Sequence, residues 1–136
     1  MQLASFSKTK FDLGYSAMKV NQNLPIFLIK DLEKKINLKN KTIGIMGLSF
    51  KPDIDDLRQS PALYVARKLY LEKKFNLLFV EPNIKEHEQF QLCDISQAIN
   101  KSDILVYLVA HQQFLDIKFK NGITLDFCGV NQKNFN

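Results

Sequence analysis

The sequence predicts an α/β fold of three layers, in which a mainly parallel sheet is flanked by helices and preceded by an N-terminal helical arm. Short apolar runs of strand length recur along the chain without polar alternation, as in strands that are buried on both faces. Segments with helical spacing separate these runs, and such alternation is typical of a parallel sheet covered by helices. We place the arm in residues 1–40 and the sheet domain in residues 41–136.

The composition is that of one globular domain. The chain has 136 residues, of which 46% are hydrophobic and 24% charged, so it can bury a core. No apolar run approaches the ~18 residues of a membrane span. The first residues lack the apolar core and cleavage site of a secretory signal. We therefore expect a cytoplasmic protein without membrane contact.

The net charge of +5 permits an anionic partner without naming one. Five lysines between positions 30 and 41 form a basic stretch. We interpret this stretch as the solvated face and last turn of a helix, where cations suit the helix dipole. Contact with nucleic acid is the weaker interpretation, because no interleaved aromatic residues or known nucleic-acid module accompany the lysines.

The cysteines and histidines predict no metal site. Cys93 and Cys128 are far apart and form no CxxC pair, so we expect two reduced, buried thiols. His87 and His111 are isolated, and neither has the spacing of a metal ligand. We interpret each histidine as a surface or helix-end residue.

The arm contains one clear helix. Residues 11–23 can be helical, and Pro25 then marks a fresh start because proline is tolerated in a first turn. In this second helix Ile29, Leu32 and Ile36 share one face, which further apolar residues widen. The face packs either on the domain's own sheet or on something outside the domain, and the sequence leaves both open.

The sheet domain follows as alternating strands and helices. Ser60 is a good N-cap and Pro61 suits the first helical position, so a helix runs from there to about Lys74. A short helix is expected at residues 94–100, whereas residues 84–92 stay unassigned. The expected strands are residues 42–48, 75–80, 103–110 and 123–127.

The connection between the first strand and its helix is the main functional candidate. It has about eleven residues, where such loops usually run ~2–6. Lys51 lies where a ligand would sit, and its ammonium can pair with a diphosphate. Arg58 can clamp a phosphate or carboxylate, and Phe50 can form an apolar wall or fill the core. Alternatively, Lys51 and Arg58 pair internally with the aspartates at positions 53, 55 and 56.

Two further signals for nucleotide binding are weak. Gly44 and Gly47 form G-x-x-G rather than G-x-G-x-x-G, and no helix follows directly. We interpret both glycines as places where small residues permit close packing. Glu81 ends the second strand, where an acid can hold ribose hydroxyls, but Pro82 favours a simple turn.

The loop sequence resembles a known family. Residues 47–61, Gly-Leu-Ser-Phe-Lys-Pro-Asp-Ile-Asp-Asp-Leu-Arg-Gln-Ser-Pro, are similar to the signature opening the UDP-binding domain of the UDP-glucose/GDP-mannose dehydrogenase family. Within this family, the motif is most similar to that of the UDP-N-acetylmannosamine dehydrogenase branch. Residues 19–25 resemble the end of the family's central dimerisation region. The resemblance covers about residues 15–130. It implies a Rossmann-like domain in which Phe50 and Lys51 contact the UDP-sugar, and Arg58 reaches the NAD of a neighbouring subunit.

The resemblance also implies a reaction. Members oxidise C6 of a nucleotide sugar to a carboxylate with two NAD⁺, through a thiohemiacetal and a thioester on a cysteine. The family's N-terminal NAD-binding domain and most of its central domain, with the catalytic cysteine, have no counterpart here. Cys93 and Cys128 lie in the wrong domain to replace it. Phe127-Cys128-Gly129 stands where many members have an arginine that helps to bind UDP-sugar.

We therefore expect the UDP-sugar-binding C-terminal portion of an NAD-dependent nucleotide-sugar 6-dehydrogenase, a homodimer through its arm and inactive alone. It would be either a truncated gene product or a cloned piece of a longer one, and NAD would be held mainly by the missing domain. One alternative is a non-catalytic interaction remnant with an empty pocket, which dimerises without responding to nucleotide. A nucleic-acid-binding domain, whose binding would depend steeply on salt, is the weakest alternative.

Overall fold

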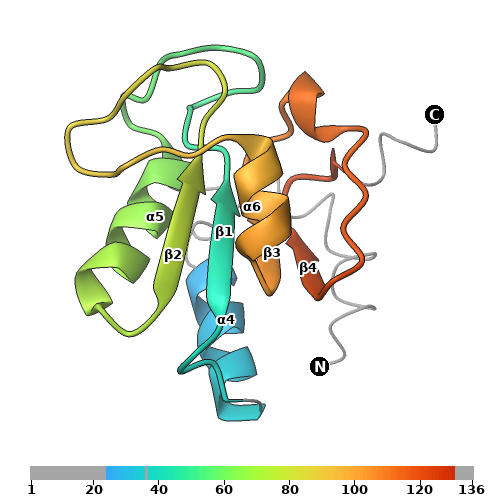
Figure 1. The fold of residues 1–136 in the computed structure, drawn as a ribbon. Coiled ribbons are helices and arrows are strands. Elements are labelled where there is room, and N and C mark those ends of the chain that lie inside the picture. The colour runs from blue at the N-terminus through green and yellow to red at the C-terminus, as the bar shows by residue number, and fades with distance from the viewer. Residues whose placement is uncertain (1–23, 36, 131–136) are drawn as a thin grey trace.

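The sheet is parallel and has four strands in the order β2-β1-β3-β4. The computed structural model describes residues 24–35 and 37–130. The strands are β1 (Thr42–Met46), β2 (Asn76–Val80), β3 (Ile104–Tyr107) and β4 (Ile123–Asp126). The helices are α4 (Leu24–Lys35), α5 (Pro61–Glu72) and α6 (Ile95–Lys101), with a 3-10 turn η1 (Gln112–Phe114). The predicted α/β class is confirmed (Figure 1).

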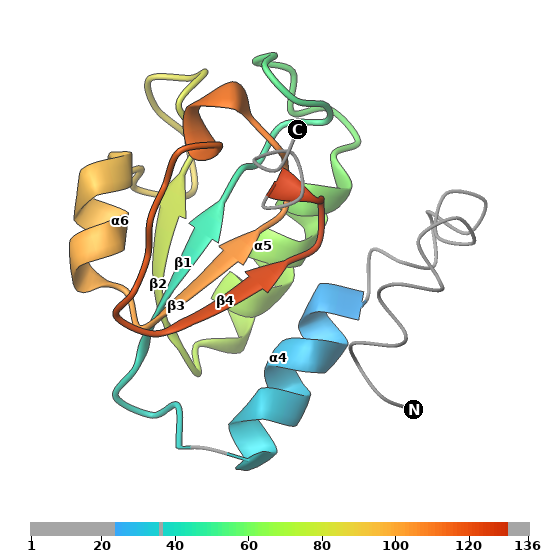
Figure 2. The same ribbon diagram turned by 90° about the vertical axis from the view of Figure 1, so that its right-hand side faces the viewer.

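Helices cover both faces of the sheet. Figure 2 shows α6 on one face and α4 with α5 on the other. Ile43 and Ile45 of β1 belong to the cluster that includes α5, whereas Met46 belongs to the cluster that includes α6. Alternate residues of the strand therefore pack into opposite layers, as the period of two in a β-strand requires.

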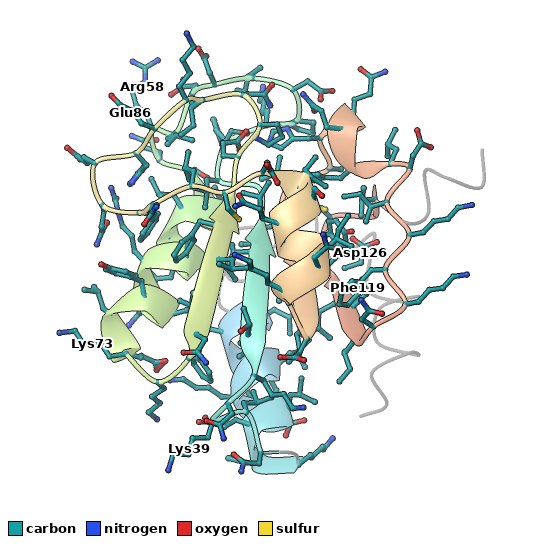
Figure 3. The ribbon with its side chains drawn as sticks, in the orientation of Figure 1. Lys39, Arg58, Lys73, Glu86, Phe119 and Asp126 are labelled. Atoms are coloured by element: carbon teal, nitrogen blue, oxygen red, sulfur yellow. The ribbon has the colours of Figure 1, made fainter. Side chains whose placement is uncertain are left out.

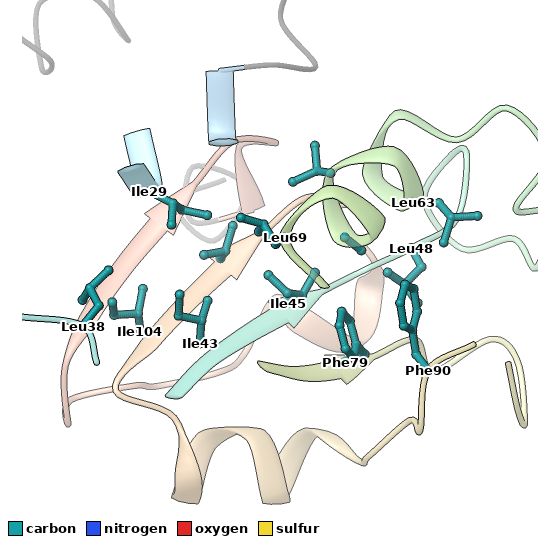
Figure 4. Close-up of a cluster of buried hydrophobic side chains, with 13 residues drawn as sticks. Ile29, Leu38, Ile43, Ile45, Leu48, Leu63, Leu69, Phe79, Phe90 and Ile104 are labelled. Carbon is teal, nitrogen blue, oxygen red and sulfur yellow. The ribbon is translucent and has the colours of Figure 1, made fainter. Parts of the chain in front are cut away.

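Helix α4 packs on the domain's own core. Ile29 is 1% exposed and joins the cluster formed by Ile43 and Ile104 (Figure 4). An ion pair of 2.8 Å between Lys30 Nζ and a Glu72 carboxylate oxygen ties α4 to the end of α5. Phe27, in contrast, is 65% exposed. One of the two alternatives for this helix is thus realised, and an apolar side chain remains on its other side. Residues 1–23, with the other predicted helix, lie outside the described residues, as does Ile36.

The helix boundaries follow from their caps. Ser60 Oγ accepts a hydrogen bond from the Leu63 N–H at 3.1 Å, as predicted for an N-cap. The helix ends at Glu72, slightly earlier than expected, because Lys73 adopts a left-handed conformation with φ 56°. Asp94 and Gln97 form a reciprocal capping box that starts α6.

The predicted strands 42–48 and 103–110 both end early, and Gly47 shows why. Its φ is 102°, and a Cβ there would lie 2.7 Å from the Cβ of Val109. The N–H groups of Leu108 and Val109 both reach the Met46 carbonyl, at 2.9 and 3.4 Å. The segments that follow β1 and β3 therefore leave the sheet together. The close packing expected of Gly47 is confirmed.

The topology places a switch point beside β1. From β1 the chain moves to β2 on one side, and it later returns to β3 on the other. The connections after β1 and β3 therefore diverge. In open α/β sheets, the crevice between two diverging connections at the carboxyl ends of the strands is where ligands bind.

Among the described residues, no helix has the length and apolarity to cross a membrane. That part of the chain also holds no cluster of three or more potential metal-ligating side chains.

Candidate functional site

The long connection after β1 arches over the carboxyl end of the sheet. It lies at the same end as the turn after β2 and the segment that carries η1 (Figure 1). The Gly47 N–H donates to the Val80 carbonyl at 2.8 Å, which keeps the start of the connection beside β2. Three segments far apart in the sequence thus meet at the switch point.

A buried carboxylate joins these segments. Glu81 is 2% exposed, and its Oε1 accepts the N–H groups of Leu48 and Ser49 at 2.9 and 3.1 Å. Its Oε2 accepts the N–H and the side-chain amide of Asn83 at 3.0 and 3.2 Å. Burial by itself raises the pKa of the Glu81 carboxyl, but hydrogen bonds from His111, Leu48 and Asn83 together bring that pKa below its ordinary value.

This arrangement confirms one interpretation and corrects another. Residues after Glu81 form the expected turn, with the Ile84 N–H on the Glu81 carbonyl at 3.3 Å, and the Glu81 side chain also anchors the connection after β1. His111 does precede η1, yet it is no surface residue, because none of its side chain is exposed. Its Nε2 lies 2.8 Å from Glu81 Oε1.

Ser49, His111 and Glu81 do not form a hydrolytic triad. The Ser49 Oγ lies 3.3 Å from the same Nε2 that contacts Glu81, whereas a triad uses both ring nitrogens. The Ser49 hydroxyl also donates to the Lys51 carbonyl at 2.7 Å. These buried groups therefore fix the backbone of the connection.

The predicted ligand contacts project from this fixed backbone. Phe50 is 46% exposed, and its N–H donates to the Asp56 carbonyl at 2.8 Å. Lys51 is exposed, with its Nζ 5.9 Å from the centroid of the Phe50 ring. The structure thus brings an aromatic face and an ammonium together, and Phe50 does not fill the core. A shallow cavity of about 380 Å³ at the same loop is lined by Asp53, Ile54, Asp55 and Asn83, and not by Phe50 or Lys51.

Arg58 stands apart from this pair. Its Nε and Nη2 donate to the two oxygens of Asp56, both at 3.0 Å, so the predicted internal pairing occurs for this residue. Those hydrogen bonds lower the pKa of Asp56 to about 2. The Arg58 side chain is nevertheless 89% exposed.

An open groove of about 1200 Å³ adjoins Arg58. It runs along α5, where Tyr64 and Arg67 line it, to the segment with Glu86 and His87. Figure 3 shows Arg58 and Glu86 projecting at the same end of the molecule. The groove carries charges of both signs, so its lining does not select one ligand charge.

The last strand ends in a turn held by an aspartate. Asp126 Oδ1 accepts the N–H groups of Cys128, Gly129 and Val130 at 3.2, 2.9 and 3.2 Å. Burial, followed by the charge of Asp126, raises the pKa of Tyr107 to about 12. This carboxylate therefore holds the turn at Cys128 and Gly129, where the family resemblance implies an arginine that this sequence does not have.

Both cysteines are partly buried, rather than fully buried as expected. Burial raises the pKa of the Cys93 thiol, which disfavours the thiolate that a nucleophile needs. His87 accepts the N–H groups of Gln89 and Phe90 and stacks on the Phe90 ring, so its role is local. Cys93 and His87 thus add no reactive group to the site.

Sequence reasoning missed the network beneath the loop. Local sequence patterns do not connect Glu81 and Asn83 with His111, which lies 30 positions after Glu81. A signal was present, because Glu81 and His111 both follow buried strands of a parallel sheet, and such strand ends meet at one edge. Their contact could have been expected from topology, although not its geometry.

Comparison with known proteins identifies related chains. Residues 44–132 match the family model described as "UDP-glucose/GDP-mannose dehydrogenase family, UDP binding domain". The chain is 40% identical over 111 residues to UDP-N-acetyl-D-mannosamine dehydrogenase of Campylobacter jejuni, covering 76% of this chain and 27% of the relative. It is 36% identical over 123 residues to NDP-N-acetyl-D-galactosaminuronic acid dehydrogenase of Ralstonia solanacearum, covering 85% and 29%. The chain thus spans less than a third of these relatives.

Solved structures share the fold. A UDP-glucose dehydrogenase from Pyrobaculum islandicum superposes with a TM-score of 0.69 at 22% identity, covering 95% of this chain and 33% of that one. UDP-D-ManNAc dehydrogenase from Pyrococcus horikoshii gives a TM-score of 0.63 at 22% identity, covering 92% and 32%. At these identities the likeness establishes the architecture alone.

Proposed function

Because the chain belongs to the UDP-glucose/GDP-mannose dehydrogenase family and carries its UDP-binding domain, we propose that it binds a UDP-sugar at the carboxyl end of β1. The observation that carries this proposal is the pairing of exposed Phe50 and Lys51 on a backbone that buried groups hold fixed. Preorganised contacts of this kind reduce the entropy lost on binding.

Each residue has a distinct role in the proposal. The Lys51 ammonium pairs with the diphosphate, and the Phe50 ring forms an apolar wall beside it. Arg58 reaches an NAD molecule bound by a neighbouring subunit. Its present partner, Asp56, does not oppose this role strongly, because an exposed ion pair contributes little and can be exchanged for a phosphate.

The described residues do not themselves fit NAD. A diphosphate cradle needs open glycine backbone that leads directly into a helix. Here Gly47 is crowded by Val109, and α5 begins only at Pro61. We therefore place the cofactor mainly on a domain other than this one, and no step of a reaction is assigned to this domain beyond holding the nucleotide-sugar.

The complete activity that we propose is that of the UDP-N-acetylmannosamine branch. The chain would be the C-terminal portion of an NAD-dependent 6-dehydrogenase of the cytoplasm that forms UDP-N-acetylmannosaminuronate. Its similarity to an enzyme named for UDP-N-acetyl-D-mannosamine supports this choice. Residues 1–40 would form the dimer contact, which the exposed Phe27 supports.

A second candidate is a non-catalytic interaction remnant whose nucleotide pocket stays empty. The pairing of Arg58 with Asp56 favours it, because a loop that satisfies its own charges has less need of a ligand. This candidate requires dimerisation without any effect of nucleotide.

Thermal unfolding with UDP, UDP-sugar and NAD⁺, each added separately, distinguishes the two. A ligand that binds only the folded state stabilises it by about 2.7 kcal/mol at a hundredfold excess over Kd. We expect UDP and UDP-sugar to raise Tm and NAD⁺ alone to leave it unchanged. Lys51→Ala should abolish the UDP shift, because the ammonium that meets the diphosphate is gone.

Lys39→Ala is the matched control. Lys39 is also an exposed lysine, but Figure 3 shows it at the opposite end of the molecule from Arg58. Its removal changes the net charge equally and should preserve the UDP shift. A Tm that does not respond to UDP in folded wild-type protein would favour the interaction remnant instead.

A further inference from the structure

His111 connects two parts of the molecule that are distant in sequence. It precedes η1 in the segment between β3 and β4, yet its ring lies under the connection after β1. Nδ1 lies 2.8 Å from the Asp53 backbone nitrogen, and Nε2 lies 2.8 Å from Glu81 Oε1. The ring thus spans from the end of β2 to the loop that carries Lys51.

The donors around the ring define its protonation. The Asp53 N–H can only donate, so Nδ1 must offer it a lone pair. The Asn83 amide nitrogen, 3.2 Å from Nδ1, adds a second donor on that side. The proton of the neutral ring then sits on Nε2, where the Glu81 carboxylate accepts it.

The two nitrogens therefore hold different things. Nε2 binds Glu81, which is itself buried and anchors the start of the connection. Nδ1 binds Asp53, two residues beyond Lys51, where the backbone is left-handed with φ 64°. A second hydrogen bond joins the same two segments: the Gln112 N–H donates to Asp53 Oδ1 at 2.7 Å. Few non-glycine residues adopt such a φ unless their surroundings impose it.

We propose that His111 is a positioning residue, which holds the loop of residues 50–56 in its ligand-binding conformation by accepting the Asp53 N–H at Nδ1. The proposal rests on the proposed UDP-sugar site and explains how that site stays ordered without ligand. Loss of the Nδ1 lone pair would leave the Asp53 N–H without this acceptor, so the loop backbone would be held less firmly.

The charged groups around the ring come from two elements. Glu81 at the end of β2 contacts Nε2, and the Asp53 carboxylate after β1 lies 4.0 Å from Nδ1. Phe114 of η1 contributes only a ring edge, 5.3 Å between centroids.

Two substitutions test the roles of the two ring nitrogens of His111 separately. In His111→Asn the side-chain oxygen lies near the former Nδ1 and can still accept the Asp53 N–H. In His111→Gln the amide reaches the former Nε2 and can still donate to Glu81, but nothing replaces Nδ1. We expect His111→Gln to weaken UDP binding about tenfold, the factor that 1.4 kcal/mol gives. His111→Asn should keep near wild-type affinity despite a lower Tm.

The comparison of the two variants is a readout that a purely structural role would not give. Both substitutions remove the buried ring, but only His111→Gln leaves the Asp53 N–H without an acceptor. Calorimetry with UDP measures the affinity of each variant and of wild type.

Hydrogen exchange of the loop amides, without ligand, tests the positioning separately from the site. Exchange over residues 50–56 should be faster in His111→Gln than in both wild type and His111→Asn. If wild type fails to bind UDP, the proposed function is wrong, and this exchange pattern alone decides the role of His111. Equal exchange in the two variants, or equal loss of UDP affinity, would overturn the proposal.

Discussion

At the scale of single residues, Glu81 shows how a buried charge can organise a site. Its two oxygens accept from the backbones of Leu48, Ser49 and Asn83, from the Asn83 amide, and from His111. A buried carboxylate is tolerated only when such donors surround it. Because these donors come from three connections, the carboxylate keeps the loop ends in one arrangement.

Glu81→Gln should lower the free energy of unfolding by about 2–4 kcal/mol near neutral pH. The amide carries two N–H donors and therefore faces either the Asn83 donors or the backbone N–H groups without an acceptor. Urea unfolding of both proteins measures the difference. Glu86→Gln, at an exposed glutamate, is the control and should change stability by less than about 0.5 kcal/mol.

Wild type and Glu81→Gln also test how the contribution of Glu81 to the free energy of unfolding depends on pH. The folded-state pKa of Glu81 is lowered, so its contribution is fully present above the unfolded-state value of about 4.3. It is lost as pH falls through the folded-state value. The stability difference between wild type and Glu81→Gln should therefore shrink only as the pH falls below about 4.3. Asp56 titrates equally in both, so a constant difference would contradict this assignment.

At the scale of elements, α4 presents two unlike faces. Ile29 is buried against the sheet, whereas Phe27, two positions earlier, is exposed. Residues two apart do not share a helix face, so one side can stabilise the domain while the other remains available for a partner. Packing on the domain's own sheet, one of the two alternatives that the sequence left open, is therefore realised, and contact with a partner through Phe27 stays a proposal.

Ile29→Ala and Phe27→Ala should therefore have different effects. The first removes core packing and should lower the free energy of unfolding by about 2–4 kcal/mol. The second should leave the stability of the monomer almost unchanged but weaken the proposed homodimer. Sedimentation velocity over a range of concentrations, with urea unfolding alongside, measures both. A dimer that survives Phe27→Ala would place the subunit contact elsewhere.

Local signals predicted the elements well, and long-range contacts explain what they missed. Ser60 with Pro61 defined the start of α5 because an N-cap acts within one turn. His111 and Asp53 are 58 positions apart, so no local pattern could pair them. The sequence placed Phe50, Lys51 and Arg58 on one loop, but only the structure shows that Arg58 pairs with Asp56 and faces a different groove.

At the scale of the whole molecule, the sheet order explains why the candidate site residues gather at the carboxyl ends of the strands. The switch point beside β1 brings together the connections after β1, β2 and β3, which supply Lys51, Glu81 and His111. The long loop is thus supported from two neighbouring connections as well as by hydrogen bonds among its own residues. Under the proposed function, a domain built in this way would present a nucleotide-sugar to groups that another domain supplies.

The polypeptide of residues 1–136 should accordingly bind without turning over. Oxidation of C6 needs a reactive thiolate and a hydride acceptor, but burial raises the pKa of Cys93 and the described residues offer no NAD cradle. We expect no NADH absorbance from the purified chain with UDP-N-acetylmannosamine and NAD⁺, under conditions where UDP raises Tm. The Tm shift is the control, since it shows that the site is folded and occupied. NADH formation above the blank would contradict this division of labour, and Cys93→Ser and Cys128→Ser would then identify which thiol supports the reaction.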